Sequence, residues 1–388
     1  MLWTVRVGIE CEYTRGIVID ELSSKPWIRL SDSENSDVFL GEYEDVDWSK
    51  AFSGHLVTNN LCFRKGLCRK ADLTLNLRKF IAKRPCSILH RSFPESYVME
   101  LHDPDYFEEA LYDVPEIQYM DPSTQQLWLA KSSLSNQGKG IFMFSSVEEL
   151  EEIMTDPQHD HHLHRYWVLQ RYVEPPMLFD ERKFHVRVYC LAVGNLQVWT
   201  CKDALALFSS YKYSGEGDEE ERNLGKYLTN TCFQQSRSEG ALEEDLVKDL
   251  KEVLTEQELE SFWTQVRETI HDVFSCVHFE PASFQALPRC FEMYGLDFVL
   301  RQDGQVFFLE ANPTPDFAMT GSRCKYIPEG FIRACMTLGI DQQLRRIPKA
   351  FPFDISAEQA SQGLISQGNM WLSYSKLVEL GESGIKFA

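Results

Sequence analysis

The clearest pattern of apolar and polar positions lies in residues 295–313, GLDFVLRQDGQVFFLEANP, where two apolar runs flank Asp303 and Gly304. Asp-Gly between two such runs is a strong hairpin signal, because a two-residue turn favours positive φ at both central positions. If these two residues form the turn, Asp297 faces Glu310 across the hairpin. We therefore predict a β-hairpin that places two carboxylates side by side.

Asn312 lies two residues beyond Glu310, so the alternation of side chains along a strand places both on one face. Asp297, Glu310 and Asn312 would then converge as two carboxylates and an amide oxygen among apolar neighbours. Oxygen ligands of this kind suit Mg²⁺, which usually keeps several waters and shares its coordination shell with phosphates. The alternative is that these three are polar strand-end residues near water.

The rest of the pattern predicts further strands and helices along the chain. The predicted strands are 3–11 with 17–19 as a further piece, 127–131, 141–144, 166–173, 183–193 and 196–207. Helical patterns cover 147–154, 239–273 and most of 317–377, whereas 30–48 is acidic and punctuated like a loop. Ser145 or Ser146 is the expected N-cap of the helix at 147–154.

A loop of small residues, 132–140 (SSLSNQGKG), separates two of these strands and follows Lys131 directly. Backbone N–H groups of such a loop can approach an anion closely, and the lysine adds positive charge. The loop is not a Walker A motif, because no helix with GK[ST] follows the glycines. It is either an ordinary turn or a cover for nucleotide phosphates, and Lys131 favours the second interpretation.

The strand at 183–193 carries Lys183, His185 and Arg187 at alternate positions, so all three share one face. Basic groups on one face of a central strand indicate a bound anion, whereas on an edge strand they would simply face water. The preceding apolar strand, 166–173, ends at a Glu-Pro-Pro sequence that suits a hinge between lobes, where backbone groups could bind an adenine.

Segment 61–91 reverses the charge of the chain, with nine Lys or Arg residues against a single acid, Asp72. The whole chain has a formal net charge of −20, so this local reversal is informative. The segment is either a solvated helix face or an electropositive wall for phosphates or an acidic peptide. The histidine cluster at 159–164 reads as a solvated loop rather than a metal site, because it lacks a partner cluster at zinc spacing.

Length and composition exclude several classes of protein. The 388 residues, 43% of them hydrophobic, exceed one compact core and predict two or three lobes. The acidic balance argues against nucleic acid as a partner, and no apolar run approaches the about 18 residues of a membrane span. The N-terminus lacks the apolar core of a signal peptide, and the eleven cysteines form no CxxC pair, so we expect reduced thiols and a cytoplasmic location.

In combination, the lysine with its small-residue loop, the hinge strand, the basic strand and the late Asp…Glu-x-Asn pattern resemble the ATP-grasp ligases. The resemblance is closer still to the tubulin–tyrosine ligase family, and it spans about residues 55–320. The segments that carry it are CRKADL (68–73), FPESYV (93–98), WLAKSSLSNQGKGI (128–141), VLQRYVEPPML (168–178), RKFHVRVYCL (182–191), YLTNTC (227–232) and YGLDFVL…FFLEANPTP (294–315). FPESYV is more similar to the branch that adds tyrosine than to the glutamylases.

The resemblance implies a chain of the α+β or α/β class with the ATP-grasp fold, in which mixed antiparallel sheets and helices hold the nucleotide between two lobes. We expect a small N-terminal α/β lobe at 1–66 and a central ATP-grasp lobe at 67–170. The C-terminal ATP-grasp lobe would cover 171–388, with the Mg²⁺-binding hairpin and a helical tail.

The resemblance also implies roles for individual residues. The catalytic residues would be Arg187, Lys183 and Lys131, of which Lys183 and Arg187 would hold phosphate and the acceptor carboxylate. The nucleotide would be bound by Lys70, Lys131 and Lys183 at the phosphates, by Gln170, Arg171, Tyr172 and Val173 at the adenine, and by Thr229 and Asn230 at the ribose and phosphates. Mg²⁺ would be bound by Asp297, Glu310 and Asn312.

The implied reaction is an ATP-dependent ligation of a carboxylate to an amine. A peptide C-terminal carboxylate attacks the γ-phosphate of ATP, and the amine of free tyrosine captures the acyl phosphate with release of ADP and phosphate. The implied acceptor is tubulin or another protein with an acidic C-terminal tail, and the cofactors are ATP and Mg²⁺. Because triphosphate and carboxylate repel each other, Mg²⁺, Lys and Arg must neutralise both.

Three positions depart from the family pattern. His185 stands where the family usually has Asp, Leu207 stands where a family arginine helps to hold substrate, and Arg171 replaces a lysine. Loss of a guanidinium weakens recognition of an acidic peptide end. Three functions are therefore compatible with the sequence: a ligase that adds tyrosine or another amino acid to an acidic tail, a nucleotide-binding interaction module without turnover, and a ligase for a small carboxylate.

Overall fold

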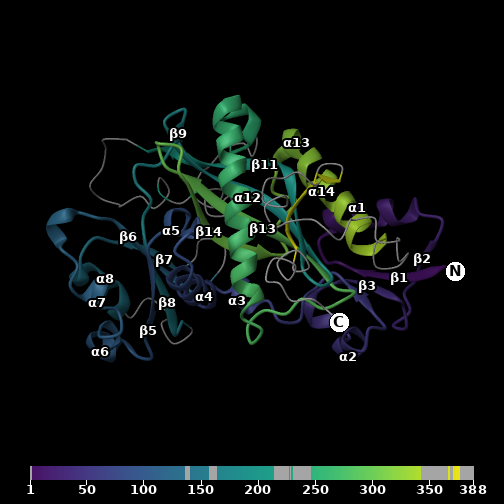
Figure 1. Cartoon of the computed structure of the whole chain (residues 1–388), viewed down its shortest axis with the longest axis horizontal. Helices are drawn as coiled ribbons and strands as arrows, with labels where there is room; N and C mark the ends of the chain where they lie inside the picture. Colours follow the sequence, from purple (N-terminus) through teal and green to yellow (C-terminus); the bar gives the residue numbers. More distant parts are fainter. Residues whose placement is uncertain are drawn as a thin grey trace.

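The computed structural model describes residues 2–135, 140–156, 164–213, 227, 229, 246–341, 366–367 and 370–375. Three β-sheets follow one another along the chain, and helices lie on their faces (Figure 1). The first and second sheets lie at opposite ends of the molecule, and the largest sheet lies between them (Figure 1). No helix among the described residues is long and apolar enough to cross a membrane.

The N-terminal sheet is parallel, with the strand order β2-β1-β3-β4. Its strands are β1 (Trp3–Gly8), β2 (Ile28–Leu30), β3 (Val38–Gly41) and β4 (Val57–Thr58), and its helices are α1 (Glu12–Ser23), η1 (Tyr43–Asp45) and α2 (Trp48–Phe52). A small α/β unit is therefore present at this end of the chain, as the sequence predicts.

Two sequence predictions in this region are wrong. Residues 17–19 belong to α1 rather than to a strand, because Ile17, Val18 and Leu22 share the buried face of a helix. The supposed loop 30–48 contains β3, whose four residues are all buried. A short strand covered on both sides in a parallel sheet shows no alternation, so its sequence resembles any brief apolar run.

The second sheet is antiparallel, with the order β5-β8-β6-β7. Its strands are β5 (Ser96–Glu100), β6 (Trp128–Ser132), β7 (Ile141–Phe144) and β8 (Tyr166–Arg171). The helices around it are α3 (Lys65–Cys68), α4 (Lys70–Lys83), α5 (Leu89–Ser92), η2 (Pro104–Tyr106), α6 (Phe107–Leu111), α7 (Pro115–Gln118), η3 (Pro122–Thr124) and α8 (Val147–Thr155). The predicted strands in this region are confirmed, and so is the cap of α8, because the Ser146 hydroxyl accepts from the Glu149 amide at 3.2 Å.

The largest sheet runs β14-β13-β10-β11-β16-β15, with β12 paired to β11 and β9 paired to β10. Its strands are β9 (Leu178–Phe179), β10 (Arg182–Val193), β11 (Gln197–Lys212), β12 (Val247–Asp249), β13 (Phe291–Leu300), β14 (Val306–Pro313), β15 (Ser366–Gln367) and β16 (Met370–Ser375). The accompanying helices are η5 (Leu250–Glu252), α12 (Glu256–His278), α13 (Gly321–Cys324), α14 (Tyr326–Met336) and η6 (Thr337–Asp341). The mixture of parallel and antiparallel sheets with helices agrees with the predicted fold class.

Strand β10 separates two cores because its side chains alternate between the faces of the large sheet. Val186, Val188 and Cys190 belong to the core that includes the long helix α12, which crosses the sheet in Figure 1. Tyr189 and Leu191 face the other way, where the Tyr189 ring stacks on Phe331 of α14 at 5.2 Å. The second face of β10 is therefore apolar toward its C-terminal end, and its N-terminal end is left for the basic residues 183–187.

The helical predictions in this region need two corrections. The helix expected at 239–273 begins only at Glu256, where Thr255 and Glu258 form a capping box, and the segment before it contains strand β12. The expected helical tail contains strand β16, which pairs with β11. Both short strands exist through pairing with β11, a partner distant in sequence, and local periodicity carries no trace of such pairing.

The β13–β14 hairpin has the predicted pairing of Asp297 with Glu310, but its turn differs from the prediction. Only Gly304 has positive φ, at 82°, and the Arg301 amide donates to the Gln305 carbonyl at 2.9 Å, so the loop is longer than two residues. A shift in register between Asp297 and Phe298 then restores the predicted alignment. A bulge of this kind re-aims the side chains beyond it, which here are the polar ones.

An ion pair between buried Glu292 and partly buried Arg64 connects the start of α3 with β13. Glu292 is 2% exposed and pairs with Arg64, and it also accepts from the Tyr294 hydroxyl at 2.6 Å and the Leu61 amide at 3.3 Å. The Arg64 guanidinium also lies 4.4 Å from the centre of the Tyr43 ring. This cluster joins the N-terminal unit, through Tyr43, to the largest sheet, through Glu292 on β13.

Replacing Glu292 with Ala should destabilise the protein by about 2 kcal/mol, because the partly buried Arg64 guanidinium loses its charged hydrogen-bond partner. Urea unfolding of the variant and the wild type measures this loss. Glu260→Ala, at an exposed position of α12, is the matched control. A loss no larger than that of the control, within about 0.5 kcal/mol, would show that the cluster contributes nothing to folding.

Candidate functional site

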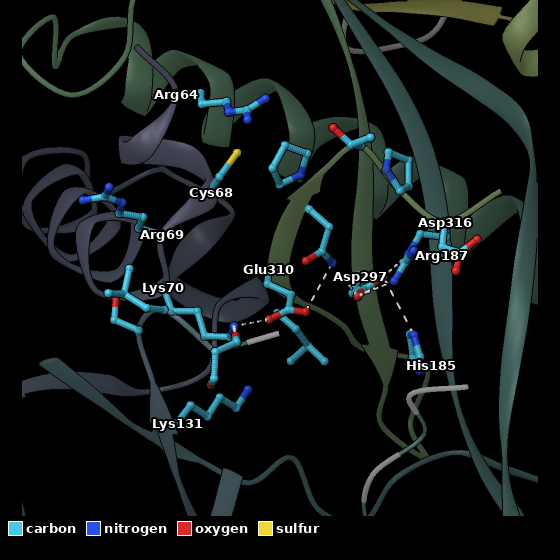
Figure 2. A pocket seen from close by; sticks show the side chains of 18 of the residues that line it. Arg64, Cys68, Arg69, Lys70, Lys131, His185, Arg187, Asp297, Glu310 and Asp316 are labelled. Atoms are coloured by element: carbon cyan, nitrogen blue, oxygen red, sulfur yellow. Dashed lines mark hydrogen bonds and ion pairs between the residues drawn. The ribbon is translucent and has the colours of Figure 1, made fainter. Parts of the chain in front are cut away.

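A cavity of about 970 Å³ opens between the largest sheet on one side and the second sheet with α3 and α4 on the other. Figure 2 shows Lys70 and Lys131 on one side of Glu310 and Asp297, with Arg187 and His185 on the other. The cavity therefore draws its charged groups from segments that are far apart in the sequence.

One row of residues crosses four neighbouring strands at the floor of the cavity. Leu205 on β11 pairs with Arg187 on β10, Arg187 pairs with Asp297 on β13, and Asp297 pairs with Glu310 on β14. Paired residues of adjacent strands point to the same face of a sheet. The register therefore brings one guanidinium and two carboxylates into contact in a line.

The amide of Asn312 bridges the two carboxylates. Its Nδ2 donates to Asp297 Oδ2 at 3.1 Å and to Glu310 Oε1 at 3.2 Å. The structure thus brings together the three residues that the sequence predicts as a magnesium site. The donor set fits a divalent cation, provided that Asn312 turns its amide oxygen toward the ion. Among the described residues no group of three or more His, Cys, Asp and Glu side chains could hold a metal, so this amide, water and phosphate would complete the shell.

Two cations compensate these carboxylates. The Arg187 guanidinium makes two contacts with Asp297, one of them from Nη2 to Oδ2 at 3.0 Å, and Lys70 Nζ lies 3.4 Å from Glu310 Oε2. Burial opposes ionisation of Glu310, but the charges of Lys70 and Lys131 lower its pKa to about 2. Burial disfavours the charged form of Arg187 as well, yet Asp297 raises its pKa above the ordinary value. Glu310 and Arg187 are therefore both charged at neutral pH.

Gly295 gives the Arg187 side chain the space it needs. A Cβ at this position would lie 2.8 Å from Arg187 Cδ and 3.1 Å from Pro315 Cβ. Since Gly295 pairs with Tyr189, two residues from Arg187 on β10, only a residue without a side chain lets the guanidinium cross β13 toward Asp297. The glycine in the GLDFVL segment is thus a requirement of packing.

Two buried lysines face the carboxylates from other elements. Lys131 on β6 donates to Gln170 Oε1 at 2.6 Å, and Gln170 in turn donates to Ser96 at 2.9 Å. Lys183 on β10 donates to the Tyr227 carbonyl at 2.6 Å and lies 4.4 Å from the centre of the Tyr172 ring. Burial lowers the pKa of Lys131 to about 8 and that of Lys183 to about 7. An anion that entered the cavity would restore full charge to both lysines.

His185 and Leu207 face each other across β10 and β11. His185 Nδ1 lies 2.6 Å from the Thr229 hydroxyl, and Nε2 lies 3.8 Å from Asp297 Oδ1. Burial lowers the pKa of His185 to about 4, so the imidazole is neutral at physiological pH. His185 and Leu207, which depart from the family pattern, therefore form an uncharged pair next to Asp297.

The predicted adenine residues lie elsewhere. Gln170 supports Lys131, Arg171 is exposed with its Nη1 3.4 Å from Glu95, and Tyr172 lies beneath Lys183. The wall of the cavity, as far as the chain is described, includes neither these residues nor Val173, and offers Leu129 and Ile141 as apolar surface. Their role in adenine binding stays a prediction, and Asn230 lies outside the described residues.

The basic segment 61–91 divides into two parts. Arg64, Lys65, Arg69 and Lys70 line the cavity, whereas Arg78 pairs with Glu116 and Lys79 pairs with Glu280. The charge reversal in the sequence signals this wall, but not which of its residues face inward.

Sequence reasoning missed two other parts of the wall, the η1 residues Tyr43 and Glu44 and the loop residues Thr314 and Asp316. Thr314, just beyond β14, has a φ of 51°, which is uncommon for a residue other than glycine. The NPTP sequence around it is a turn signal that could have marked this loop.

The lysine pKa values predict a pH dependence of folding. A depressed lysine pKa means that the unfolded chain binds more protons, so the stability contribution of Lys183 rises with pH from about 7 toward the unfolded value. Urea unfolding of wild type and Lys183→Met at pH 7 and pH 9 should show wild type gaining about 1 kcal/mol per pH unit over the variant. The exposed Lys83→Met should show no such trend, and a flat difference for Lys183→Met would contradict the assignment.

Comparison with known proteins identifies relatives over most of the chain. The sequence profile of the tubulin-tyrosine ligase family matches residues 55–347. A probable tubulin–tyrosine ligase of Schizosaccharomyces pombe is 28% identical over 380 residues, covering 87% of this chain and 91% of that protein. PBY1, a probable tubulin–tyrosine ligase of Saccharomyces cerevisiae, is 29% identical over 347 residues, which cover 76% of this chain but 45% of that protein.

Further relatives are described as probable tubulin polyglutamylases and as polyglycylases, one of which is called inactive. The chain spans between 23% and 52% of the length of these proteins. The relatives therefore share a family but differ in the amino acid that their descriptions name.

A solved structure shows the same architecture. The crystal structure of the C-terminal domain of K. lactis Pby1, described as an ATP-grasp enzyme interacting with the mRNA decapping enzyme Dcp2, superposes with a TM-score of 0.69 at 25% identity. The match covers 91% of this chain and 97% of that domain. This chain therefore belongs to the tubulin-tyrosine ligase family and has the ATP-grasp fold.

Proposed function

We propose that the chain is an ATP-dependent ligase that joins an amino acid to the C-terminal carboxylate of an acidic protein tail. The observation that carries this proposal is the cluster of Asp297, Glu310 and Asn312 in contact with Arg187 and Lys70. In such a reaction the triphosphate and the acceptor carboxylate, both negative, must come together. Cationic side chains can bind these anions, and the carboxylates beside them can hold the metal ion that neutralises the phosphates. In this proposal the nucleotide lies between the units at 67–170 and 171–388.

The charged residues divide into two functions in the proposed reaction. Lys70, Lys131 and Lys183 bind the phosphates of ATP, since they approach the cavity from α4, β6 and β10. Asp297, Glu310 and Asn312 hold Mg²⁺, which when bound supplies charge neutralisation at the phosphate oxygens. Arg187 orients the acceptor carboxylate toward the γ-phosphate, and the resulting acyl phosphate is captured by the incoming amine, with release of ADP and phosphate.

An acidic tail is the favoured acceptor. Lys65 and Arg69 line the same cavity and add positive charge beyond the phosphate-binding lysines, in a chain whose net charge is −20. Complementary charge of this kind attracts an acidic peptide. Tubulin is the acceptor named for several relatives, so we take its α-chain tail as the first candidate.

Tyrosine is the proposed amino acid, because FPESYV resembles the tyrosine branch and two relatives are described as probable tyrosine ligases. Because Leu207 cannot donate the hydrogen bonds of a family arginine, we expect a lower affinity for the acceptor tail. His185 and Leu207 pair across β10 and β11, so an Asp–Arg pair of the family pattern is replaced by a neutral pair with no change in net charge. Charge balance at the floor is thereby kept.

A second candidate is a nucleotide-binding interaction module with little or no turnover. The neutral His185–Leu207 pair favours it, and so does the description of the K. lactis domain as interacting with a decapping enzyme. Such a module would bind ATP, gain thermal stability from it and release no ADP. A ligase for a small carboxylate would instead release ADP when metabolites, rather than peptide tails, are added.

Incubation with ATP, Mg²⁺, labelled tyrosine and detyrosinated tubulin should transfer label to tubulin and release equimolar ADP. Labelled glutamate and glycine, tested in parallel, should transfer less. Asn312→Ala is the control, because it removes the amide that joins the two carboxylates. Label and ADP no higher than in that control would reject the ligase proposal and leave the interaction module.

Glu310→Gln tests the metal site with a change of charge at constant shape. With Mg²⁺ present, ATP affinity should fall at least about tenfold, or about 1.4 kcal/mol. Without Mg²⁺ the variant should bind ATP at least as well as wild type, because a carboxylate that repels the phosphates is gone. Titration calorimetry in both conditions measures this, with the exposed Glu260→Gln as control. An unchanged response to Mg²⁺ would remove Glu310 from the site.

A further inference from the structure

His185 carries a buried nitrogen that the proposed reaction does not use. The residue is 5% exposed and lines the cavity, and its Nε2 has no hydrogen-bond partner among the described residues. Buried polar atoms are rarely left in this state, because an unmade hydrogen bond costs free energy. Such an atom in a cavity wall is placed to bind a ligand that enters the cavity.

Thr229 gives the imidazole a definite orientation. Its hydroxyl lies 2.6 Å from His185 Nδ1, so a proton on Nδ1 leaves the lone pair of Nε2 facing the cavity. Metal-bound histidines usually hold their second nitrogen in this way, with an oxygen partner that fixes the tautomer. The ring is thus oriented as a ligand would be.

Asp297 provides a second donor at a suitable distance. His185 Nε2 and Asp297 Oδ1 are 3.8 Å apart without a hydrogen bond between them. Two donor atoms bonded to one ion at about 2.1 Å each lie no more than about 4.2 Å apart, so a single cation can span this gap. Asp297 Oδ2 meanwhile faces Asn312, on the side of Glu310.

We propose that His185 Nε2 and Asp297 Oδ1 together hold a divalent cation, with Asp297 shared between this position and the Asn312–Glu310 side. Water and phosphate complete the shell. Imidazole nitrogen favours transition ions such as Co²⁺ and Zn²⁺, whereas an all-oxygen site favours Mg²⁺. The inference deepens the proposed function and rests on it in one respect, namely that Asp297 is a metal ligand. It changes the expected metal requirement of the chain from Mg²⁺ alone to a mixed pair.

Neighbouring charges set the condition for binding. Arg187 contacts the same Oδ1 of Asp297, and Lys183 is two residues from His185 on the same face of β10. Both cations repel a metal ion when the cavity holds no anion. Phosphate oxygens offset that repulsion, so the ion should bind more tightly when a non-hydrolysable ATP analogue is present.

Pulsed electron paramagnetic resonance of the Mn²⁺-loaded protein with that analogue tests the nitrogen ligand directly. Labelling all histidines with ¹⁵N should change the nuclear modulation of the Mn²⁺ signal, because a histidine nitrogen bonded to the ion couples to its electron spin and distant histidines do not. His185→Asp should abolish the difference between labelled and unlabelled protein. The exposed His55→Asp should preserve it. Identical spectra from labelled and unlabelled wild type would overturn the inference.

Metal preference gives an independent measure. Calorimetry with Co²⁺ and with Mg²⁺ should show that the Co²⁺-over-Mg²⁺ preference falls at least about tenfold in His185→Asp. Loss of a residue that only supports a metal ligand already weakens metal binding by about that much, so loss of the ligand itself should cost no less. Thr229→Val should weaken Co²⁺ binding while the nitrogen coupling persists. An unchanged preference in His185→Asp would contradict the inference. If wild type binds Mg²⁺ and ATP but shows no histidine coupling, this inference fails and the proposed function stands.

Discussion

Mutual compensation of buried charge is the constraint on which the site depends. Asp297 and Glu310 face each other on adjacent strands, where two carboxylates without partners would repel strongly. Arg187, Lys70 and the amide of Asn312 hold them together. In the proposed complex these pairs would be exchanged. The two carboxylates would bind the divalent cation in place of Arg187 and Lys70, and those cationic side chains would bind phosphate and the acceptor carboxylate instead. The free protein is therefore already arranged for a highly negative ligand that brings its own cation.

The fold makes this arrangement possible by giving β10 two different halves. Toward its C-terminal end, Tyr189 and Leu191 pack on the α14 side of the sheet, and toward its N-terminal end the same face carries Lys183 and Arg187. The apolar half fixes the strand, so the basic half keeps its position although it faces a cavity. Lys70 from α4 and Lys131 from β6 approach the cavity from the other side, so segments far apart in the sequence line one space (Figure 2).

Much of this was accessible from the sequence, and the exceptions have physical causes. The pairing of Asp297 with Glu310 followed from the Asp-Gly signal, although the correct register results from a longer turn combined with a bulge. Strands β3 and β16 were missed because short strands depend on partners distant in sequence. The compensating contact of Arg187 with Asp297 was not anticipated, since sequence spacing says which residues share a face but not which neighbouring strand they meet. Gly295 shows that one such contact also needs empty space, which no pattern of charges reveals.

A crystal structure with Mn²⁺ and a non-hydrolysable ATP analogue would test the central claim most directly, because anomalous scattering locates the ion without reference to any assumed ligand. The account predicts a Mn²⁺ peak bonded to Asp297, Glu310 and the oxygen of Asn312, at the roughly 2.1 Å typical of hard divalent ions. Phosphate oxygens should lie on its far side, and Lys131 and Lys183 should contact them. A peak remote from these three side chains, with the Arg187–Asp297 pair intact and the triphosphate elsewhere, would contradict the account.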